Sequence, residues 1–286
     1  MTASGTEGLR LALAFAGRVP QEEAVERAAR LDIGATVLWV DLTAGPAALA
    51  SALTRARELD VALLGLNAYA NLVHPDAETR RWNVGAARQA MRFAAEAGAP
   101  WVNTMAGTRE PAMSFWAYHP DNYSEATWAD LLEGVRELLD STPERVGLTL
   151  EPYMLTPLAT TERLRRVLDD VASPRLNVVL DPVNLVEPRE YHRSAAVVGE
   201  MFAALGRRIV AVHAKDHYMH RQKATVQIDE RVPGQGDFPY DALLRAMDAL
   251  ESRPALVIEH LSDDGQIAAA RDFIRRTAEK TGVTLR

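Results

Sequence analysis

Short apolar runs alternate with longer amphipathic segments along this chain, and the alternation repeats eight times. The apolar runs are rich in Val, Ile and Leu, as is typical of strands buried on both faces of a parallel sheet. The amphipathic segments carry helix signals, such as Pro20 in one first turn and Thr160 or Thr161 as the cap of another helix. The pattern predicts an α/β fold, a single-domain (β/α)8 barrel over residues 9–286, with a disordered leader at residues 1–8.

The connections after the strands indicate where such a barrel would carry a site. Two of them are unusually long, residues 106–123 and residues 214–238. Long loops at the carboxyl ends of barrel strands commonly build substrate pockets. An open doubly wound sheet is the alternative architecture, but segment 14–23 after the first strand lacks the glycine-rich fingerprint of a dinucleotide site.

The composition argues against several classes of function. The net charge of −7 disfavours a general nucleic-acid-binding surface, so we expect no nucleic-acid partner. The absence of cysteine excludes disulfides and thiolate ligands and fits a reducing compartment. No apolar stretch is long enough to cross a bilayer, and the start MTASGTEG does not resemble a signal peptide. We therefore expect a cytoplasmic protein without a membrane partner.

Four of the expected strands end abruptly at a side chain that binds divalent metals. They are Glu151 after VGLTL, Asp181 after LNVVL, His213 after IVAV and Glu259 after ALVI. Because all strands of a parallel barrel end at one rim, the four side chains are expected to converge. A lone carboxylate there is more often a helix cap or an ion-pair partner. Three carboxylates held together repel one another, however, and a divalent cation removes that repulsion.

The donor types indicate which metal such a site prefers. Three carboxylates and one imidazole, without sulfur, favour Mn²⁺, with Mg²⁺, Co²⁺ or Zn²⁺ as alternatives. We therefore predict one divalent ion held by Glu151, Asp181, His213 and Glu259.

The motifs around these residues resemble the xylose isomerase-like barrels, a family that includes sugar phosphate isomerases and epimerases. The resemblance covers essentially the whole chain and is carried by LEPY (150–153), LDPVNLV (180–186), VHAKDH (212–217), VPGQGDFPYDALL (232–244) and VIEH (257–260). It implies a (β/α)8 barrel with a one-metal Glu–Asp–His–Glu site, usually Mn²⁺-like. In the ketose 3-epimerases of this family the first and last glutamates also exchange protons with the substrate, which implies Glu151 and Glu259 as the catalytic acid/base pair.

The chain departs from the ketose epimerases beside the metal ligands. Asn184 stands where they commonly have His, Pro157 where another Glu is common, and Met219 where an Arg contacts the substrate. Other members of the family lose water next to a ketone or cleave C-glycosidic bonds of 3-oxo sugars, beginning with the same proton abstraction. Tyr153 occupies the place of a His that is common in the C-glycoside enzymes.

Several residues outside the ligand set are expected to contact the substrate. Asn103 and Trp116 lie at or after the end of the fourth expected strand, where sugar-binding amides and stacking aromatics are common. Lys215 and Asp216 directly follow His213, where the alternative interpretation is a rim ion pair. The substrate-binding candidates are Asn184, Lys215, Asp216, His217, Asn103, Trp116, Tyr153 and Arg231.

The second long connection is open to two interpretations. His217 and Arg231 belong to this basic segment, which either closes over an acidic or phosphorylated sugar or is a solvated charged loop. His260 directly follows a ligand and is expected to point to the opposite side of its strand from Glu259.

The sequence thus predicts a metal-dependent isomerase or epimerase of carbohydrate metabolism. Its small-molecule substrate would be a sugar or keto-polyol, from which a proton is taken next to a metal-bound carbonyl. A dehydratase, lyase or C-glycoside-cleaving enzyme acting on an oxidised sugar is the first alternative. A non-catalytic barrel that binds a sugar or a metal is the second. A homo-oligomer is compatible with the sequence.

Overall fold

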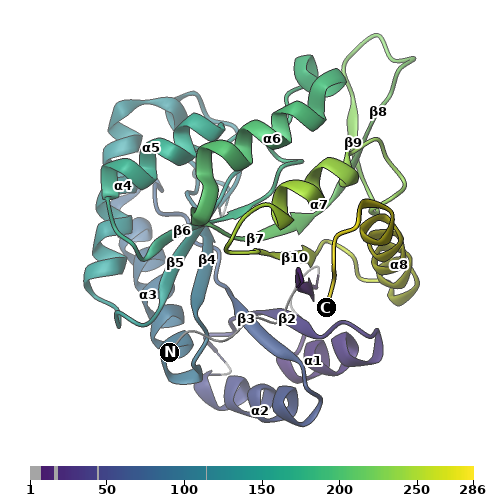
Figure 1. Cartoon of the computed structure of the whole chain (residues 1–286). Coiled ribbons are helices and arrows are strands. Elements are labelled where there is room, and N and C mark those ends of the chain that lie inside the picture. Colours follow the sequence, from purple (N-terminus) through teal and green to yellow (C-terminus); the bar gives the residue numbers. More distant parts are fainter. Residues whose placement is uncertain (1–7, 16–18, 44, 114) are drawn as a thin grey trace.

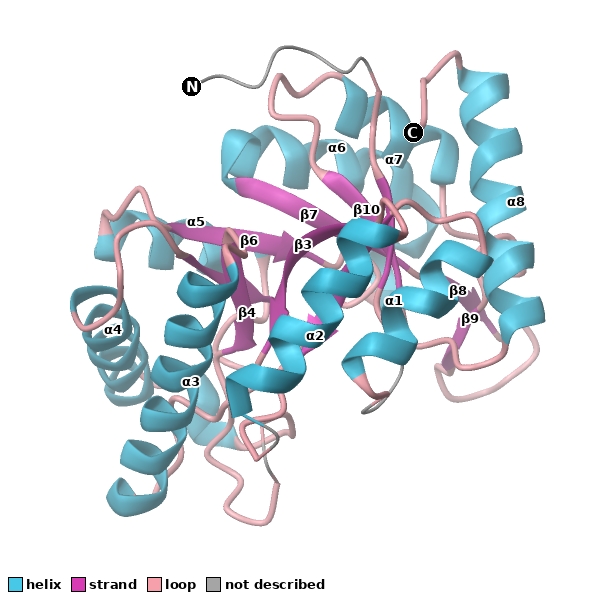
Figure 2. Ribbon diagram, turned by 90° about the horizontal axis from the view of Figure 1, so that it is seen from below, coloured by secondary structure: helices cyan, strands magenta, loops and turns pink. Residues whose placement is uncertain are grey.

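The protein is described by a computed structural model that covers residues 8–15, 19–43, 45–113 and 115–286. Eight parallel strands form a closed barrel in the order β1-β10-β7-β6-β5-β4-β3-β2. Helices follow the strands and surround the barrel, as Figures 1 and 2 show from two directions. The predicted single (β/α)8 barrel is confirmed. Residues 1–7 of the expected leader lie outside the described residues.

The barrel strands are short and the helices are of ordinary length. The strands are β1 (Leu11–Leu13), β2 (Ala35–Trp39), β3 (Ala62–Asn67), β4 (Trp101–Met105), β5 (Gly147–Glu151), β6 (Leu176–Leu180), β7 (Ile209–Ala214) and β10 (Ala255–Ile258). The α-helices are α1 (Gln21–Arg30), α2 (Gly45–Glu58), α3 (Ala77–Ala97), α4 (Glu125–Asp140), α5 (Thr161–Val171), α6 (Ser194–Leu205), α7 (Tyr240–Asp248) and α8 (Asp264–Thr281). Short 3₁₀ segments lie at Pro120–Tyr123, Pro188–Arg193 and Gly206–Arg208.

Local sequence signals account for the helix boundaries. Asp76 caps α3 by accepting a hydrogen bond from the Thr79 N–H, and Gly98 ends the same helix in the left-handed conformation. Of the two threonines expected to cap α5, Thr160 is the cap and accepts from the Arg163 N–H. A short polar side chain or a proline likewise precedes α1, α4, α7 and α8, at Pro20, Ser124, Pro239 and Asp263.

The interior of the barrel is built from small residues around one large ring. Trp101 packs against Gly65, where a β-carbon would approach the indole to 2.2 Å, so a larger residue at position 65 would displace the ring. The interior set is Ala12, Ala14, Ala35, Val37, Trp101, Val179, Ala211 and Val257. A second and larger apolar cluster lies mainly between the strands and the surrounding helices.

Strand alternation places the expected ligands directly above this interior layer. Side chains two residues apart on a strand face the same side. Val179, Ala211 and Val257 face the interior, so Asp181, His213 and Glu259 also point inward, at the carboxyl ends of their strands. The carboxyl rim of a (β/α)8 barrel is where its active sites lie.

The second long connection differs from the expected irregular loop. It contains an antiparallel hairpin of β8 (Asp216–Met219) and β9 (Ile228–Arg231), which projects from the barrel in Figure 1. Asp216 pairs with Arg231 and His217 with Glu230 in this hairpin. The many charged residues of the segment hid the strand pattern, because both faces of a projecting two-stranded ribbon can be polar.

Candidate metal centre

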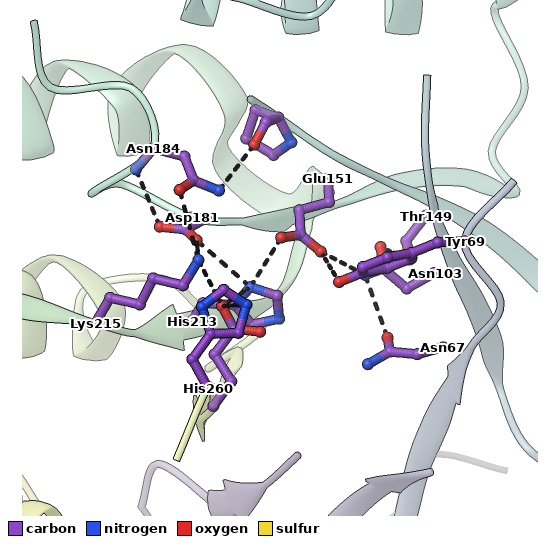
Figure 3. A network of polar contacts seen from close by, with 12 residues as sticks. Asn67, Tyr69, Asn103, Thr149, Glu151, Asp181, Asn184, His213, Lys215 and His260 are labelled. Atoms are coloured by element: carbon purple, nitrogen blue, oxygen red, sulfur yellow. Dashed lines mark hydrogen bonds and ion pairs between the residues drawn. The ribbon is translucent and has the colours of Figure 1, made fainter. Parts of the chain in front are cut away.

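The four expected ligands meet in one buried cluster. One ligand atom from each of Glu151, Asp181, His213 and Glu259 lies within 4.8 Å of every other. All four side chains are at most 5% exposed. The side chains come from β5, β7 and the residues that directly follow β6 and β10. Figure 3 labels three of them, Glu151, Asp181 and His213, which point toward one another.

The imidazole of His213 lies against the carboxylates. Its Nδ1 is 3.0 Å from Glu259 Oε1, 3.4 Å from Glu151 Oε1 and 3.8 Å from Asp181 Oδ2. Burial lowers the pKa of His213, but Glu259 and Glu151 outweigh burial and hold the pKa well above its usual range. The carboxylates of the cluster therefore favour a positive charge at this position.

Lys215 supplies one positive charge to the same cluster. Its Nζ is 2.7 Å from Asp181 Oδ2 and 2.9 Å from Glu259 Oε1, and 3.5 Å from Asn184 Oδ1. Burial raises the pKa of Asp181, but Lys215 and His213 outweigh it, so the pKa of Asp181 falls below its usual range. The pKa of Glu259 is lowered as well, because His213 and Lys215 exceed the opposing effect of burial.

The residues present fit a divalent ion on three grounds. Asp181 Oδ2, His213 Nδ1 and Glu259 Oε1 are buried and make no directed hydrogen bond within the described part of the chain, although both oxygens lie at ion-pair distance from Lys215. Buried polar atoms without hydrogen bonds are rare unless a metal or a water serves them. Three carboxylates and one ammonium leave two negative charges, which a divalent cation balances when His213 is neutral. The donors are hard oxygens and one imidazole nitrogen.

A layer of neutral groups holds Glu151 from the other side, as the dashed lines in Figure 3 trace. The Tyr69 hydroxyl and the Asn103 amide, the latter at 2.9 Å, both donate to Glu151 Oε2. Asn103 is itself oriented, because it donates to Asn67 Oδ1 at 3.3 Å and accepts from the Thr149 hydroxyl at 2.9 Å. Sequence reasoning included Asn103 among the substrate contacts and missed Tyr69.

A cavity of about 250 Å³ opens above the cluster. Its lining residues are Tyr69, Met105, Phe115, Trp116, Glu151, Tyr153, Asn184, Lys215, Glu230 and His260. Of the expected substrate contacts, Trp116, Tyr153, Asn184 and Lys215 therefore line this cavity. A hollow of about 350 Å³ near Gln21 and Trp39 contains none of the four ligands, so we assign the chemistry to the smaller cavity.

His260 lines the cavity, and its expected outward orientation is wrong. β10 ends at Ile258, and the left-handed backbone at His260 (φ 58°) breaks the alternation on which that expectation rested. The His260 Nδ1 lies 3.0 Å from Glu230 Oε1 of the hairpin, and its Nε2 lies 3.9 Å from Glu259 Oε1. Burial lowers the pKa of His260, but Glu230 and Glu259 raise it above its usual value.

Asp216 organises the hairpin and the loop behind it. Its carboxylate accepts hydrogen bonds of 2.8–3.0 Å from four backbone N–H groups, those of His217, Gly234, Gly236 and Phe238. A β-carbon at Gly236 would approach Asp216 Oδ1 to 2.4 Å, which explains the glycine in this motif. With its oxygens occupied in this way, Asp216 lies outside the cavity lining.

His217 and Arg231 also have partners away from the cavity lining. The His217 ring stacks on Tyr191 at a centroid distance of 4.5 Å and meets the edge of Phe238. Arg231 Nη2 lies 3.0 Å from Asp229 Oδ2 on the exposed face of the hairpin. The structure thus separates these two residues from the four ligands, while Lys215 and Asn184 join them.

Known proteins share this architecture. A model of the xylose isomerase-like TIM barrel matches residues 23–277. D-psicose 3-epimerase from Clostridium cellulolyticum H10, solved with D-tagatose, is 14% identical with a TM-score of 0.73, covering 94% of this chain and 99% of that one. A xylose isomerase-like TIM barrel protein from Mycobacterium smegmatis in complex with magnesium is 20% identical, with a TM-score of 0.71 and coverages of 98% and 99%.

A third similar structure is 3-keto-D-glucoside 4-epimerase from E. coli, which is 13% identical with a TM-score of 0.70, covering 93% of this chain and 99% of that one. Identities this low establish the shared fold and leave the reaction open. No curated protein sequence matches the chain. None of the described helices has the length and apolarity needed to cross a membrane. The match to the family model extends over most of the sequence, and the chain belongs to the xylose isomerase-like TIM barrel family.

Proposed function

We propose that the protein is a divalent-metal-dependent isomerase or epimerase of a sugar or keto-polyol. The observation that carries the proposal is that Glu151 and Glu259 join one buried cluster below a cavity although they come from separated strands. β6 and β7 lie between β5 and β10 in the barrel, so the two glutamates approach the cluster from different sides. Two carboxylates placed in this way can remove a proton from a carbon and return it elsewhere.

The residues of the site fall into two groups, those that would hold the ion and those that would orient a catalytic carboxylate or contact the substrate. The ion would be held by Glu151, Asp181, His213 and Glu259. A divalent ion bound there would act as a Lewis acid that polarises a carbonyl oxygen. Tyr69 and Asn103 fix one oxygen of Glu151, so its other oxygen remains directed at the cluster. Lys215 and Asn184 then present an ammonium and an amide to substrate oxygens in the cavity.

The similar structures support a carbohydrate substrate. Two of them are sugar epimerases by name, and a third was solved with magnesium. We propose Mn²⁺ as the resident ion, with Mg²⁺, Co²⁺ or Zn²⁺ as alternatives, because the donor set is mostly oxygen.

The proposal is tested by proton exchange between substrate and solvent. The metal-loaded protein, incubated with a panel of ketoses and 3-keto sugars in heavy water, should incorporate one deuterium into the carbon next to the carbonyl. Glu259→Gln should reduce this incorporation by about 10²–10⁴-fold. The matched control is Glu251→Gln, an exposed glutamate before the same strand, which should retain full activity. Equal activity of the two variants would remove Glu259 from the mechanism.

An elimination reaction is the second candidate, favoured by Tyr153 and His260. Both side chains line the cavity, and burial raises the pKa of Tyr153, which keeps its hydroxyl protonated. A protonated group near the carboxylates can donate to a leaving oxygen, as a lyase or dehydratase requires. Mass spectrometry separates the candidates, because epimerisation conserves the mass of the substrate and elimination does not.

A further inference from the structure

We propose that the substrate is a glycoside that carries an apolar, aromatic second group, and that this group binds outside the cavity on an aromatic surface. The surface, here called the aromatic shelf, consists of Trp116, Tyr118, Tyr123 and Met154. This inference rests on the proposed function, because it takes the sugar ring to lie above the metal ligands.

The shelf residues share an unusual exposure. Large apolar side chains are normally buried, and exposed apolar groups gathered in one place mark binding surfaces. Trp116 is 43% exposed, Tyr118 59%, Tyr123 38% and Met154 36%. They belong to the loops after β4 and β5, two neighbouring strands whose carboxyl ends face the site.

The shelf is continuous with the cavity. Trp116 and Tyr153 both line the cavity, and their rings meet edge to face at a centroid distance of 5.8 Å. Met154 follows Tyr153 in the chain, and its carbonyl accepts a hydrogen bond of 3.1 Å from the Tyr123 hydroxyl. The Tyr123 ring in turn contacts Tyr118 at 6.5 Å. Two ring pairs, Trp116 with Tyr153 at the cavity wall and Tyr118 with Tyr123 at the outer surface, are thus joined through the backbone carbonyl of Met154.

The cavity is small, so a substrate much larger than one sugar ring would extend beyond it. Pockets that enclose a drug-sized ligand measure about 300–1,000 Å³, whereas this cavity measures about 250 Å³. The cavity suits a ligand of the size of a single sugar ring. A group attached to that ring must leave at the mouth, where Trp116 forms part of the wall.

The composition of the shelf favours a flat apolar group, and Arg163, whose guanidinium donates to the Tyr123 carbonyl at 2.8 Å, lies beside it. The two arginines of the hairpin connection are paired with acidic partners, Arg221 with Asp237 at 3.2 Å and Arg231 with Asp229 at 3.0 Å. The shelf itself is made of two phenols, one indole and one thioether, which suit the face of a flat apolar ring.

Calorimetric binding of inert glycosides to the Mn²⁺-loaded protein tests the inference. Phenyl β-D-glucopyranoside should bind about tenfold tighter than methyl β-D-glucopyranoside. Tyr118→Ala and Met154→Ala, at shelf residues outside the cavity lining, should each reduce that difference and leave the affinity for the methyl glycoside within about twofold. The matched control is Trp82→Ala, an exposed tryptophan on α3 that is not among the residues lining the cavity, and it should retain the full difference.

Three outcomes would overturn the inference. The first is equal affinity for the phenyl and methyl glycosides in the wild-type protein. The second is a preference for cellobiose over the phenyl glycoside, which would assign the shelf to a second sugar. The third is a dimer in sedimentation that Tyr118→Ala dissociates without changing glycoside affinity, which would make the shelf a subunit interface. Metal content and deuterium incorporation measured on the same samples separate these outcomes from failure of the proposed function, which would show as protein that binds no metal or exchanges no proton with the keto sugars.

Discussion

The two halves of the barrel contribute different chemistry to the same rim. The half formed by β5, β6, β7 and β10 carries all four charged or imidazole ligands and Lys215. The half formed by β1 to β4 contributes neutral groups, above all Asn67, Tyr69 and Asn103. The neutral half adds hydrogen bonds that orient Glu151. It adds no positive charge that would compete with a bound cation for the carboxylates. The comparison shows that the charge of the site and the orientation of its ligand Glu151 come from different halves of the barrel.

Removal of a ligand from the charged half should have the largest effect. Asp181→Asn preserves the volume of the side chain but removes its charge, so we expect metal content to fall from about one ion per chain to almost none. Turnover should disappear with it. In the neutral half, Asn67→Ala should retain the metal. Elemental analysis of both variants checks the prediction, and a full complement of metal in Asp181→Asn would contradict it.

Removal of the buried ammonium should destabilise the fold while favouring the metal. Lys215→Met leaves Asp181 and Glu259 without their nearest cation, and breaking a buried pair in this way costs about 3–5 kcal/mol of unfolding free energy. Added Mn²⁺ should recover more stability in this variant than in the wild type, because the ion then meets three uncompensated carboxylates.

Urea unfolding with and without Mn²⁺ measures this difference. Lys280→Met is the control, since Lys280 is exposed and pairs with Asp241 at 3.3 Å on the surface. Surface pairs of this kind contribute about 0–1 kcal/mol. A Lys215→Met variant that unfolds like the control would show that Lys215 does not compensate the cluster.

A change in the neutral half should weaken the site without emptying it. Tyr69→Phe removes the hydroxyl that donates to Glu151 Oε2 and keeps the ring between Trp39 and Phe115. Loss of such an outer partner typically costs about 10–100-fold in metal affinity or activity. Metal titration and turnover should both be measured. Tyr218→Phe on the hairpin serves as the control, and equal behaviour of the two variants would separate Tyr69 from the site.

The smallest predicted effect concerns a histidine that lies outside both halves. Burial lowers the pKa of His217 against the smaller opposing effects of Asp216 and Asp237. A histidine with a lowered pKa in the folded state takes up protons more readily when unfolded. Its contribution to stability is therefore complete above the unfolded pKa of about 6.5 and is lost as the pH falls below it.

His217→Phe should remove this pH dependence while keeping the ring between Tyr191 and Phe238. Between pH 7.5 and 5.5 the wild type should lose more stability than the variant, by less than about 1.4 kcal/mol per pH unit. Urea midpoints at the two pH values provide the measurement. Parallel pH profiles of the two proteins would contradict the prediction.

The fold and the ligand cluster could be predicted from the sequence because both depend on local patterns. An apolar run that stops at a carboxylate predicts a strand and its rim residue together, as for Glu151 and Asp181. Tyr69 could not be found in this way, because it lies two residues beyond β3 in a connection without periodicity. Its role depends on the side chain crossing the rim to a different strand.

Two further residues escaped prediction for conformational reasons. Glu230 reaches the cavity because an apparently irregular loop forms a hairpin, and pairing between distant residues leaves no local signal. His260 turns inward because its backbone adopts a left-handed conformation, which a strand-based expectation excludes. Both misses concern backbone geometry, and neither concerns the chemistry of the side chain.

The arrangement around Asp216 separates the base of the hairpin from its tip. One carboxylate fixes four backbone groups at the base, whereas residues 221–227 at the tip are exposed. The tip can therefore be lengthened, replaced or labelled while the ligands below stay in place. For protein engineering the tip is therefore a graft site that leaves the reaction chemistry untouched.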